Sequence, residues 1–270
     1  MPEIDIRRRA EEQIVLRDQV RLAAPPTATI PDFGLAAAYD IAAEIVRIRR
    51  SRGERTVGRK IGFTNREIWT QYGLDTPIWA HMYEGTVDFA VRDHGSLSLV
   101  GMAAPRIEPE IVLKLRAAPA GSDEESLLAS IEWMAVGFEI VDCHYPDWKF
   151  QPADTVVDFG LHAALVIGTP ETFADTRNDA LLRSLKEFHI ALLCEGKEVA
   201  RGKGGFVLGS PLLALKHLRD LLTGQSGEPL SAGEIVTTGT LTAALPVRPG
   251  QTWTVSLEGI GLRPPSLTLA

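Results

Sequence analysis

Hydrophobic residues recur with helical spacing through the first fifty positions of the chain. Apolar side chains are interspersed with charged ones between residues 3 and 23, and the helix-breaking stretch AAPPTATIPDFG follows. A second amphipathic run extends from Asp32, the expected N-cap, to about Arg50, and Gly53 follows it as a stop signal. The pattern therefore predicts a helical N-terminal segment over residues 1–55, with two helices that pack against the rest of the chain.

From about Thr56 onward the pattern changes to short β-rich runs separated by glycine and proline. These runs include GTVDFAV, RIEPEIVLKL, MAVGFEIVD, ALVIG, FHIALLCEG and TWTVSLEGIG. Helical spacing interrupts them at roughly 122–133 and at 211–223, and Glu195-Gly196 predicts a hairpin turn. Strands and helices do not alternate regularly, which argues against a doubly wound parallel sheet. We expect an α+β, β-rich core over residues 56–270 with antiparallel or mixed sheets, and one structural domain overall.

Composition excludes several classes of protein. The 270 residues are 45% hydrophobic and 23% charged, and the net charge of −7 gives no basic surface for nucleic acid or an anionic membrane. Two cysteines are too few for a disulfide framework or a cysteine-rich zinc site. The N-terminus has no apolar signal region, and no apolar run approaches membrane-spanning length. We expect a cytoplasmic protein without a nucleic-acid or membrane partner.

Two glutamates stand two residues apart in the apolar stretch PRIEPEIVLKL. Glu108 and Glu110 would point to the same face of a strand, where like charges repel and burial is unfavourable. Glu139 lies in a second strand-like run, MAVGFEIVDCH. A hard divalent cation such as Mg²⁺ or Mn²⁺ prefers oxygen ligands, and its charge would offset the repulsion among three such buried acids. The alternative is half-exposed strands with glutamates that point to solvent, and the spacing alone leaves both interpretations open.

Five stretches of the chain together resemble one enzyme family. They are GRKIGFTNREIW, PRIEPEIVLKL, GFEIVDCHYPDWKFQPADTVVDFG, GGFVLGSPLLAL and LSAGEIVTTGTLTAALPVRPGQTWTVSLEGIG. In this order they are similar to the 2-keto-4-pentenoate hydratase/4-oxalocrotonate decarboxylase family of the fumarylacetoacetate hydrolase superfamily, and the similarity extends from about residue 32 to the end. The resemblance implies a mixed β-roll or barrel, and it implies that Glu108, Glu110 and Glu139 are the ligands of a Mg²⁺ or Mn²⁺ ion.

The resemblance also implies roles for residues around the metal. Lys60, in GRKIGFT, is implied to point into the metal pocket, where it could stabilise an enolate or relay a proton. Thr240 matches a hydroxyl position that binds the substrate carboxylate in relatives, and Gly239 would let a backbone N–H approach the ligand closely. Arg66, or its neighbour in the motif Arg59, could hold a substrate carboxylate. The residues alone are equally compatible with a surface lysine, exposed arginines and a plain turn at a strand end.

The chain departs from the family pattern after the third glutamate. Relatives carry Ser-Arg where this chain has Cys143-His144, and Asp-Asn with a small hydroxyl residue where it has Asp158-Phe159-Gly160-Leu161. We expect these positions to line or border the pocket and to affect the choice of substrate. His144 is a candidate proton donor or carboxylate partner in place of the arginine. The alternatives are a supporting position behind the ligands or an exposed turn.

The resemblance implies a divalent-metal-dependent lyase that hydrates a 2-hydroxy-2,4-dienoate to a 4-hydroxy-2-oxo acid, as in the catabolism of aromatic compounds. The cation would act as a Lewis acid at the substrate's 2-oxygen, and Lys60 would manage the proton. Decarboxylation of a 2-oxo-3-enedioate such as 4-oxalocrotonate is the first alternative. Acylpyruvate hydrolysis, for which HMYE offers His81 and Glu84, and a non-catalytic subunit that supports a partner enzyme are the others. We expect a small-molecule substrate and a homo-oligomer.

Overall fold

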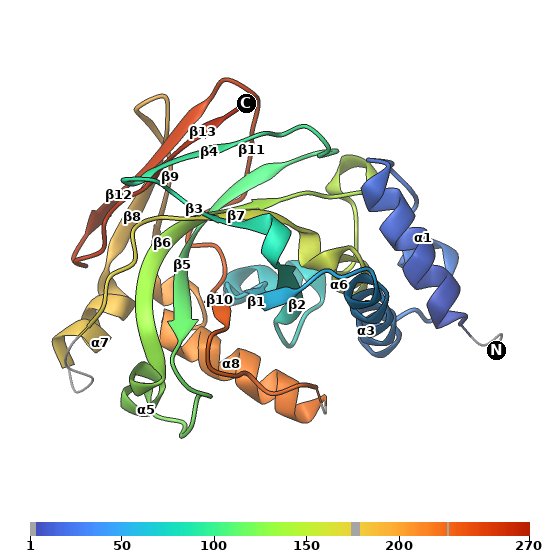
Figure 1. Ribbon diagram of the computed structural model, residues 1–270, viewed down its shortest axis with the longest axis horizontal. Helices are drawn as coiled ribbons and strands as arrows, with labels where there is room; N and C mark the ends of the chain where they lie inside the picture. Colours follow the sequence, from blue (N-terminus) through green and yellow to red (C-terminus); the bar gives the residue numbers. More distant parts are fainter. Residues whose placement is uncertain (1–3, 174–178, 226) are drawn as a thin grey trace.

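The computed structural model describes residues 4–173, 179–225 and 227–270 (Figure 1). The α-helices in these residues are α1 (Ile6–Asp18), α2 (Pro26–Thr29), α3 (Leu35–Ser51), α4 (Trp69–Tyr72), α5 (Glu124–Ala129), α6 (Pro152–Val157), α7 (Asp179–Glu187) and α8 (Pro211–Gly224). Figure 1 shows α1 and α3 side by side at one end of the molecule. Within the described ranges, no helix combines the length and the apolar character needed to cross a membrane.

The strands form two sheets of mixed direction. They are β1 (Thr56–Gly62), β2 (Ile78–Tyr83), β3 (Val87–Phe89), β4 (His94–Leu97), β5 (Arg106–Leu115), β6 (Ile131–Val141), β7 (His162–Ile167), β8 (His189–Cys194), β9 (Lys197–Lys203), β10 (Ile235–Thr237), β11 (Leu245–Pro246), β12 (Thr252–Glu258) and β13 (Ser266–Leu269). The larger sheet has the order β2–β1–β10–β5–β6–β7–β3, with β11 also paired to β5, and the smaller has the order β4–β13–β12–β8–β9. Parallel pairs β1–β10, β3–β7 and β4–β13 lie among antiparallel ones, which confirms the expected mixed, β-rich α+β fold.

The long strands β5 and β6 carry apolar and acidic side chains on opposite faces. On one face Ile107, Ile111 and Phe138 are fully buried in the main hydrophobic core, which also includes the buried face of α8 and residues of the smaller sheet. Alternation along a strand sends every second side chain to the other face. That other face carries the glutamates, so the packing that buries the apolar residues also fixes the direction in which the acids point.

A second apolar cluster joins the N-terminal helices to the sheet. Ile14 of α1 and Ile41 of α3 pack with Ile78 at the start of β2 and with Val156 of α6, and all four side chains are buried. The predicted helical N-terminal segment is therefore present, and its apolar faces are covered by residues from the β-rich part of the chain.

Local signals in the sequence located several boundaries well and others poorly. The helix α8 begins close to the predicted position, and Ser210 caps it by accepting a hydrogen bond from the Leu213 backbone N–H. Glu195 and Gly196 form the tight turn between β8 and β9, as predicted. The second long helix, by contrast, begins at Leu35 after Gly34, while Asp32 adopts a left-handed backbone with a φ of 55° and is not its cap. The short helix α5 ends at Ala129, earlier than predicted, because β6 begins at Ile131.

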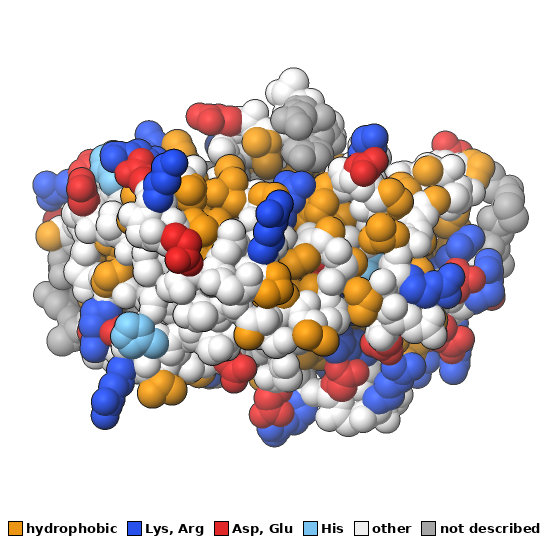
Figure 2. All heavy atoms as spheres, turned by 90° about the horizontal axis from the view of Figure 1, so that it is seen from above, with side chains coloured by type: hydrophobic (Ala, Val, Ile, Leu, Met, Phe, Trp, Pro, Cys, Tyr) orange, Lys and Arg blue, Asp and Glu red, His pale blue; other side chains and the backbone are white. Residues whose placement is uncertain are grey.

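Charged side chains of both signs surround one face of the molecule. Figure 2 shows Lys and Arg interspersed with Asp and Glu around this face, with hydrophobic side chains gathered near its middle. Opposite charges that alternate in this way do not produce the field of one sign that attracts a polyanion. This face therefore offers no continuous basic surface among the residues described.

Candidate metal centre and active site

Three carboxylates converge on the acidic face of β5 and β6. The register places Glu108 of β5 directly opposite Glu139 of β6. Glu110, two residues farther along β5, lies opposite Gly137. One carboxylate oxygen from each of the three glutamates lies within 4.8 Å of the others. Directly opposed like charges destabilise a sheet. The arrangement therefore requires a cation or protons between the carboxylates.

The surroundings give the three glutamates different proton affinities. Burial alone would raise the pKa of Glu139, but Lys60 and His162 oppose it and hold the pKa of this carboxyl at about 2. Burial, only partly offset by Lys60, raises the pKa of Glu108 to about 7. Burial and the charge of Glu139 raise the pKa of Glu110 well above its ordinary value. Near neutral pH, Glu139 carries the negative charge, and the other two carboxylates hold protons readily.

Lys60 is buried beside these acids. Its ammonium Nζ donates a hydrogen bond to Glu139 Oε2 at 2.9 Å, and the residue is 3% exposed. Burial disfavours the charged amine, but the negative charges of Glu139, Glu108 and Glu110 outweigh it and raise the pKa of Lys60. Lys60 is therefore an ammonium at neutral pH. The resemblance implied that this lysine points into the metal pocket, and the contact brings it beside the three acids.

The donor set fits a hard divalent cation. All three groups offer oxygen, as Mg²⁺ and Mn²⁺ prefer, and Glu110 is fully buried with an Oε1 atom that has no hydrogen-bond partner. Its other oxygen, Oε2, accepts a hydrogen bond from the Gly239 backbone N–H at 2.7 Å. Gly239 has a φ of 95°, and a Cβ there would lie 1.9 Å from Thr64 Oγ1, so only glycine fits. The predicted close approach of this backbone is made to a candidate metal ligand.

A cavity of about 410 Å³ opens directly above the carboxylates. Lys60, Glu108, Glu110 and Thr240 all line it, and the Thr240 hydroxyl donates to the Thr242 carbonyl at 2.8 Å. The lining also includes apolar side chains, among them Trp148, Phe150 and Leu161, and the cations Arg106 and Arg201. The volume and this mixture of polar and apolar groups suit a small organic acid.

Arg66 and Arg59 do not reach this cavity. Arg66 lines a neighbouring hollow, which shares Asn65 and Phe206 with the cavity. It lies near His217, with 3.5 Å between Arg66 Nη2 and His217 Nε2. Arg59 is 3% exposed, and its Nη1 lies 3.5 Å from a carboxylate oxygen of Glu234. Adjacent strand residues point to opposite faces, so the direction of Lys60 turns Arg59 away from the carboxylates. Neither arginine lines the cavity in this structure, and their role as substrate ligands stays a prediction.

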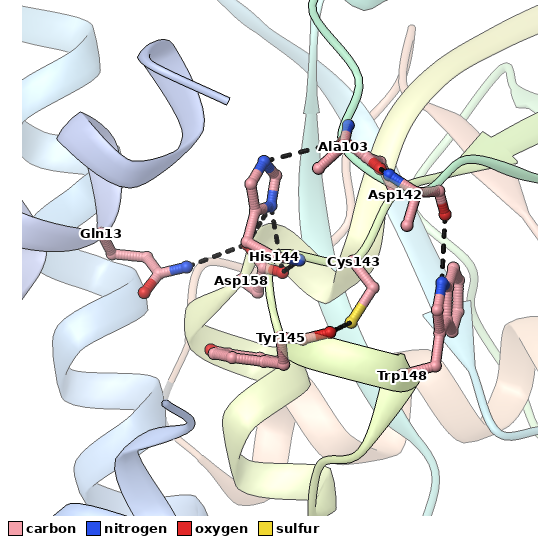
Figure 3. Close-up of polar contacts among 9 residues, drawn as sticks. Gln13, Ala103, Asp142, Cys143, His144, Tyr145, Trp148 and Asp158 are labelled. Atoms are coloured by element: carbon pink, nitrogen blue, oxygen red, sulfur yellow. Dashed lines mark hydrogen bonds and ion pairs between the residues drawn. The ribbon is translucent and has the colours of Figure 1, made fainter. Parts of the chain in front are cut away.

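His144 lies in a buried polar network beside α1, outside the residues that line the cavity. Figure 3 shows it between Asp158, toward which Gln13 of α1 points, and Asp142. His144 Nδ1 lies 3.0 Å from Asp158 Oδ1, and Gln13 donates to the same oxygen at 2.9 Å. Burial lowers the proton affinity of the imidazole, but the hydrogen bond and charge of Asp158 raise its pKa overall. His144 thus lies outside the cavity lining and is linked through Asp158 to Gln13 of α1, and its catalytic role stays a prediction.

His81 and Glu84, considered for acylpyruvate hydrolysis, also lie apart from the acids. The register pairs Lys60 with Ala80 and Arg59 with His81, which places His81 on the face opposite Lys60. Glu84 forms an ion pair with Arg55. These two residues form no catalytic pair with the three carboxylates.

Two residues near the carboxylates were not predicted. Arg106 lines the cavity, and its guanidinium carbon lies 3.9 Å from the centre of the Trp148 ring. Its position two residues before Glu108 placed it on the same face of the strand, so the spacing could have indicated it. His162 Nδ1 lies 2.7 Å from Glu139 Oε1. No local signal marks His162, because its contact depends on the pairing of β6 with β7.

Comparisons with known proteins agree with this geometry. The family model described as fumarylacetoacetate (FAA) hydrolase C-terminal matches residues 73–263. The chain is 31% identical over 243 residues to a 2-hydroxyhexa-2,4-dienoate hydratase from Comamonas testosteroni, with 89% of each chain covered. It is 34% identical over 228 residues to a 4-oxalocrotonate decarboxylase from a Pseudomonas species, with 82% of this chain and 83% of the relative covered.

Solved structures extend the likeness to the whole fold. A 4-oxalocrotonate decarboxylase from Pseudomonas putida G7, complexed with magnesium and adipate, superposes with a TM-score of 0.87 at 28% identity, covering 98% of this chain and 97% of the other. A fumarylpyruvate hydrolase from Pseudomonas aeruginosa, at 15% identity and a TM-score of 0.57, covers 79% of this chain and 89% of its own and shares the fold. The chain belongs to the fumarylacetoacetate hydrolase family.

Proposed function

We propose that the protein is a divalent-metal-dependent hydro-lyase that converts a 2-hydroxy-2,4-dienoate into a 4-hydroxy-2-oxo acid. The observation that supports this most directly is the meeting of three carboxylates and a buried ammonium, of which Glu108, Glu110 and Lys60 line one cavity. The hydratases and decarboxylases among the relatives act on unsaturated acids of this type, as their names state.

Glu108, Glu110 and Glu139 would hold a Mg²⁺ or Mn²⁺ ion. When bound, such an ion supplies Lewis-acid stabilisation of negative charge on a substrate oxygen. Lys60 lines the cavity as an ammonium, so it can donate a proton to the far carbon of the dienol when the substrate ketonises. The 2-hydroxyl releases its proton as the carbonyl forms. The resulting amine can then take a proton from the water whose oxygen adds at C4, and the enolate left by that addition takes up a proton at C3, so the net change is the addition of one water. Trp148, Phe150 and Leu161 surround the carbon chain and limit access of other water molecules.

Decarboxylation of a 2-oxo-3-enedioate is a second candidate, which Arg106 favours. Arg106 and Arg201 add two cations to a cavity whose lining already includes two of the carboxylates and Lys60. A dicarboxylate would place its second carboxylate near such a cation, whereas a dienoate with an apolar end has no group for it. The geometry at Lys60 serves both reactions, so Arg106 is the residue that distinguishes the two substrates.

The test is direct turnover by the purified protein with Mg²⁺ or Mn²⁺. A panel of 2-hydroxydienoates and 2-oxo-3-enedioates is incubated with the protein, and the products are identified by mass. A gain of water indicates hydration, and a loss of carbon dioxide indicates decarboxylation. An Arg106→Met variant should lose activity toward dicarboxylates more than toward monocarboxylates if the arginine binds the second carboxylate. If the metal-loaded protein converts no compound of the panel, the lyase proposal is wrong, and the protein is better interpreted as a non-catalytic subunit.

The remaining predictions from the sequence fit this proposal. A homo-oligomer in the cytoplasm that takes part in the catabolism of aromatic compounds is the setting we propose. Light scattering combined with size-exclusion chromatography measures the mass in solution, and a monomer at micromolar concentration would contradict the oligomer.

A further inference from the structure

The carboxylate of Glu139 is held from two sides. Lys60 Nζ donates to Oε2 at 2.9 Å, and His162 Nδ1 approaches Oε1 at 2.7 Å. The proposed function, on which this inference rests, uses Lys60 but gives His162 no role. The two donors differ in position: Lys60 lines the cavity, whereas His162 is 2% exposed and lies behind the carboxylate, outside the lining.

The orientation of the His162 ring follows from its two partners. An ionised carboxylate only accepts hydrogen bonds, so Nδ1 must carry the proton that is shared with Glu139. On the other side of the ring, Nε2 lies 2.9 Å from the hydroxyl of Thr86, which follows β2. The Thr86 hydroxyl also donates to the Tyr83 carbonyl at 2.9 Å, so its contact with Nε2 ties the ring to the segment that follows β2. Both ring nitrogens are engaged, and the ring cannot rotate without breaking a hydrogen bond.

The backbone that leads to His162 is strained. Phe159, Gly160 and Leu161 have φ values of 57°, 61° and 60°, so three consecutive residues adopt the left-handed conformation, and two of them have side chains. Each non-glycine residue in this region costs about 1–2 kcal/mol. A Cβ at Gly160 would lie 2.7 Å from Ala80 Cβ and 3.3 Å from Lys60 Cδ. The turn thus packs against the stem of Lys60 and delivers His162 to Glu139, and strain of this kind concentrates at functional sites.

We propose that His162 is a positioning residue that fixes Glu139 for a divalent cation and thereby leaves the ammonium of Lys60 free to turn toward the substrate. The carboxylate keeps one donor when Lys60 moves, because His162 approaches the other oxygen from outside the cavity. Without His162, Lys60 is the remaining side-chain donor to Glu139 among the contacts described. Loss of the imidazole should therefore weaken cation binding and also reduce the freedom of the lysine.

The experiment measures Mg²⁺ affinity by calorimetry and by the metal-induced rise in melting temperature. His162→Leu removes both ring nitrogens, and we expect Mg²⁺ to bind about 10–100-fold more weakly, as is typical when a partner of a metal ligand is lost. His162→Asn places an amide N–H close to where Nδ1 stood and should recover most of that affinity. His81→Leu is the matched control, because His81 belongs to the same sheet but points to the opposite face, and its affinity should equal that of the unchanged protein.

Two outcomes would overturn the proposal. One is a folded His162→Leu protein that binds Mg²⁺ as tightly as the unchanged protein. The other is His162→Asn that binds as weakly as His162→Leu. If His162→Leu does not fold, Thr86→Val tests the same chain of contacts: weaker Mg²⁺ binding supports the proposal, and unchanged binding contradicts it. Because Mg²⁺ binding is measured without substrate, failure of the proposed lyase activity in the unchanged protein would be a separate result.

Discussion

The three glutamates are the same type of residue, yet the fold gives them different charges. Glu139 is held as an anion by Lys60 and His162, whereas Glu108 and Glu110 have raised pKa values because burial penalises their charge and Glu139 repels it. A divalent cation must therefore displace protons from the site as it binds. The protonation of the three glutamates therefore depends on their mutual interactions and on whether the metal is bound.

Mg²⁺ affinity should increase as the pH rises from 6 to 8. The pKa of Glu108 is raised to about 7, so protons compete with the cation across this range. We expect affinity to rise by up to about tenfold per pH unit below that pKa for each proton displaced. Calorimetry in two buffers of different ionisation enthalpy counts the protons released. Equal affinity at pH 6 and pH 8, with no proton release, would show that the acids are already ionised.

The metal-free protein should become less stable over the range in which metal binding improves. In the folded state Glu108 keeps its proton up to a pKa of about 7, while the unfolded chain loses it near the ordinary value of about 4.3. Between these values the folded state binds more protons, so stability falls as the pH rises. Glu139, with a folded pKa of about 2, changes stability only at lower pH. Melting curves at pH 5 and 8 with a chelator, compared with curves in excess Mg²⁺, measure the effect.

Replacement of Glu139 by Gln should abolish the stabilisation by Mg²⁺. The amide keeps the shape of the side chain but removes the negative charge that Lys60 and His162 hold in place. Ligand binding to the folded state raises its melting temperature by mass action, so loss of binding removes the rise. Thermal melts with and without Mg²⁺ check this. A full metal-induced rise in Glu139→Gln would exclude this carboxylate as a ligand.

Lys60→Met should separate chemistry from binding. Methionine keeps much of the apolar stem and deletes the ammonium, so folding should be retained. We expect kcat to fall by about a hundredfold or more, the usual effect of a lost acid–base group, with less change in KM. Mg²⁺ should bind at least as tightly, because a nearby positive charge is gone. Turnover at the unchanged rate would show that Lys60 donates no proton.

At the scale of elements, the sequence predicted what depends on local periodicity and missed what depends on long-range pairing. The two-residue spacing of Glu108 and Glu110 gave their common face, and the repulsion that this creates pointed to a cation. The cross-strand pairing of Glu108 with Glu139 is set by the register of β5 and β6, which only the resemblance anticipated. The network around His144 could not be anticipated, because Gln13 of α1 contacts Asp158, the partner of His144, from more than a hundred residues away in the sequence.

The contact of α1 with the core predicts a stability effect without a metal effect. Gln13 donates to Asp158, the carboxylate that also binds His144, and is 5% exposed. Hydrogen bonds to charged groups contribute about 1.5–3 kcal/mol. Gln13→Ala should therefore lower the free energy of unfolding by about that amount in urea titrations, while Mg²⁺ affinity stays unchanged. Gln19→Ala, at the exposed end of the same helix, is the matched control and should change stability by less than about 0.5 kcal/mol.

At the scale of the whole molecule, the second apolar cluster determines whether the N-terminal helices unfold together with the rest of the chain. Ile41 of α3 and Leu215 of α8 lie in different clusters, and both are almost completely buried. The first cluster includes residues of both sheets, while the second combines α1 and α3 with β2 and α6. Because β2 is part of the larger sheet, loss of the helices would expose an apolar surface of the sheet itself. The two clusters should therefore unfold together, as the prediction of one structural domain requires.

This cooperativity can be tested with one substitution in each cluster. Ile41→Ala and Leu215→Ala should each lower stability by about 2–5 kcal/mol, the usual effect of truncating a buried aliphatic side chain to alanine. In a two-state protein, far-ultraviolet circular dichroism and tryptophan fluorescence give coincident guanidinium transitions, and each variant shifts both midpoints equally. Mg²⁺ should raise both midpoints together, since it binds only the folded state. If Ile41→Ala instead produced an early loss of helical signal while the fluorescence transition and its response to Mg²⁺ stayed in place, residues 1–55 would be a separately unfolding segment, and the site would not depend on them.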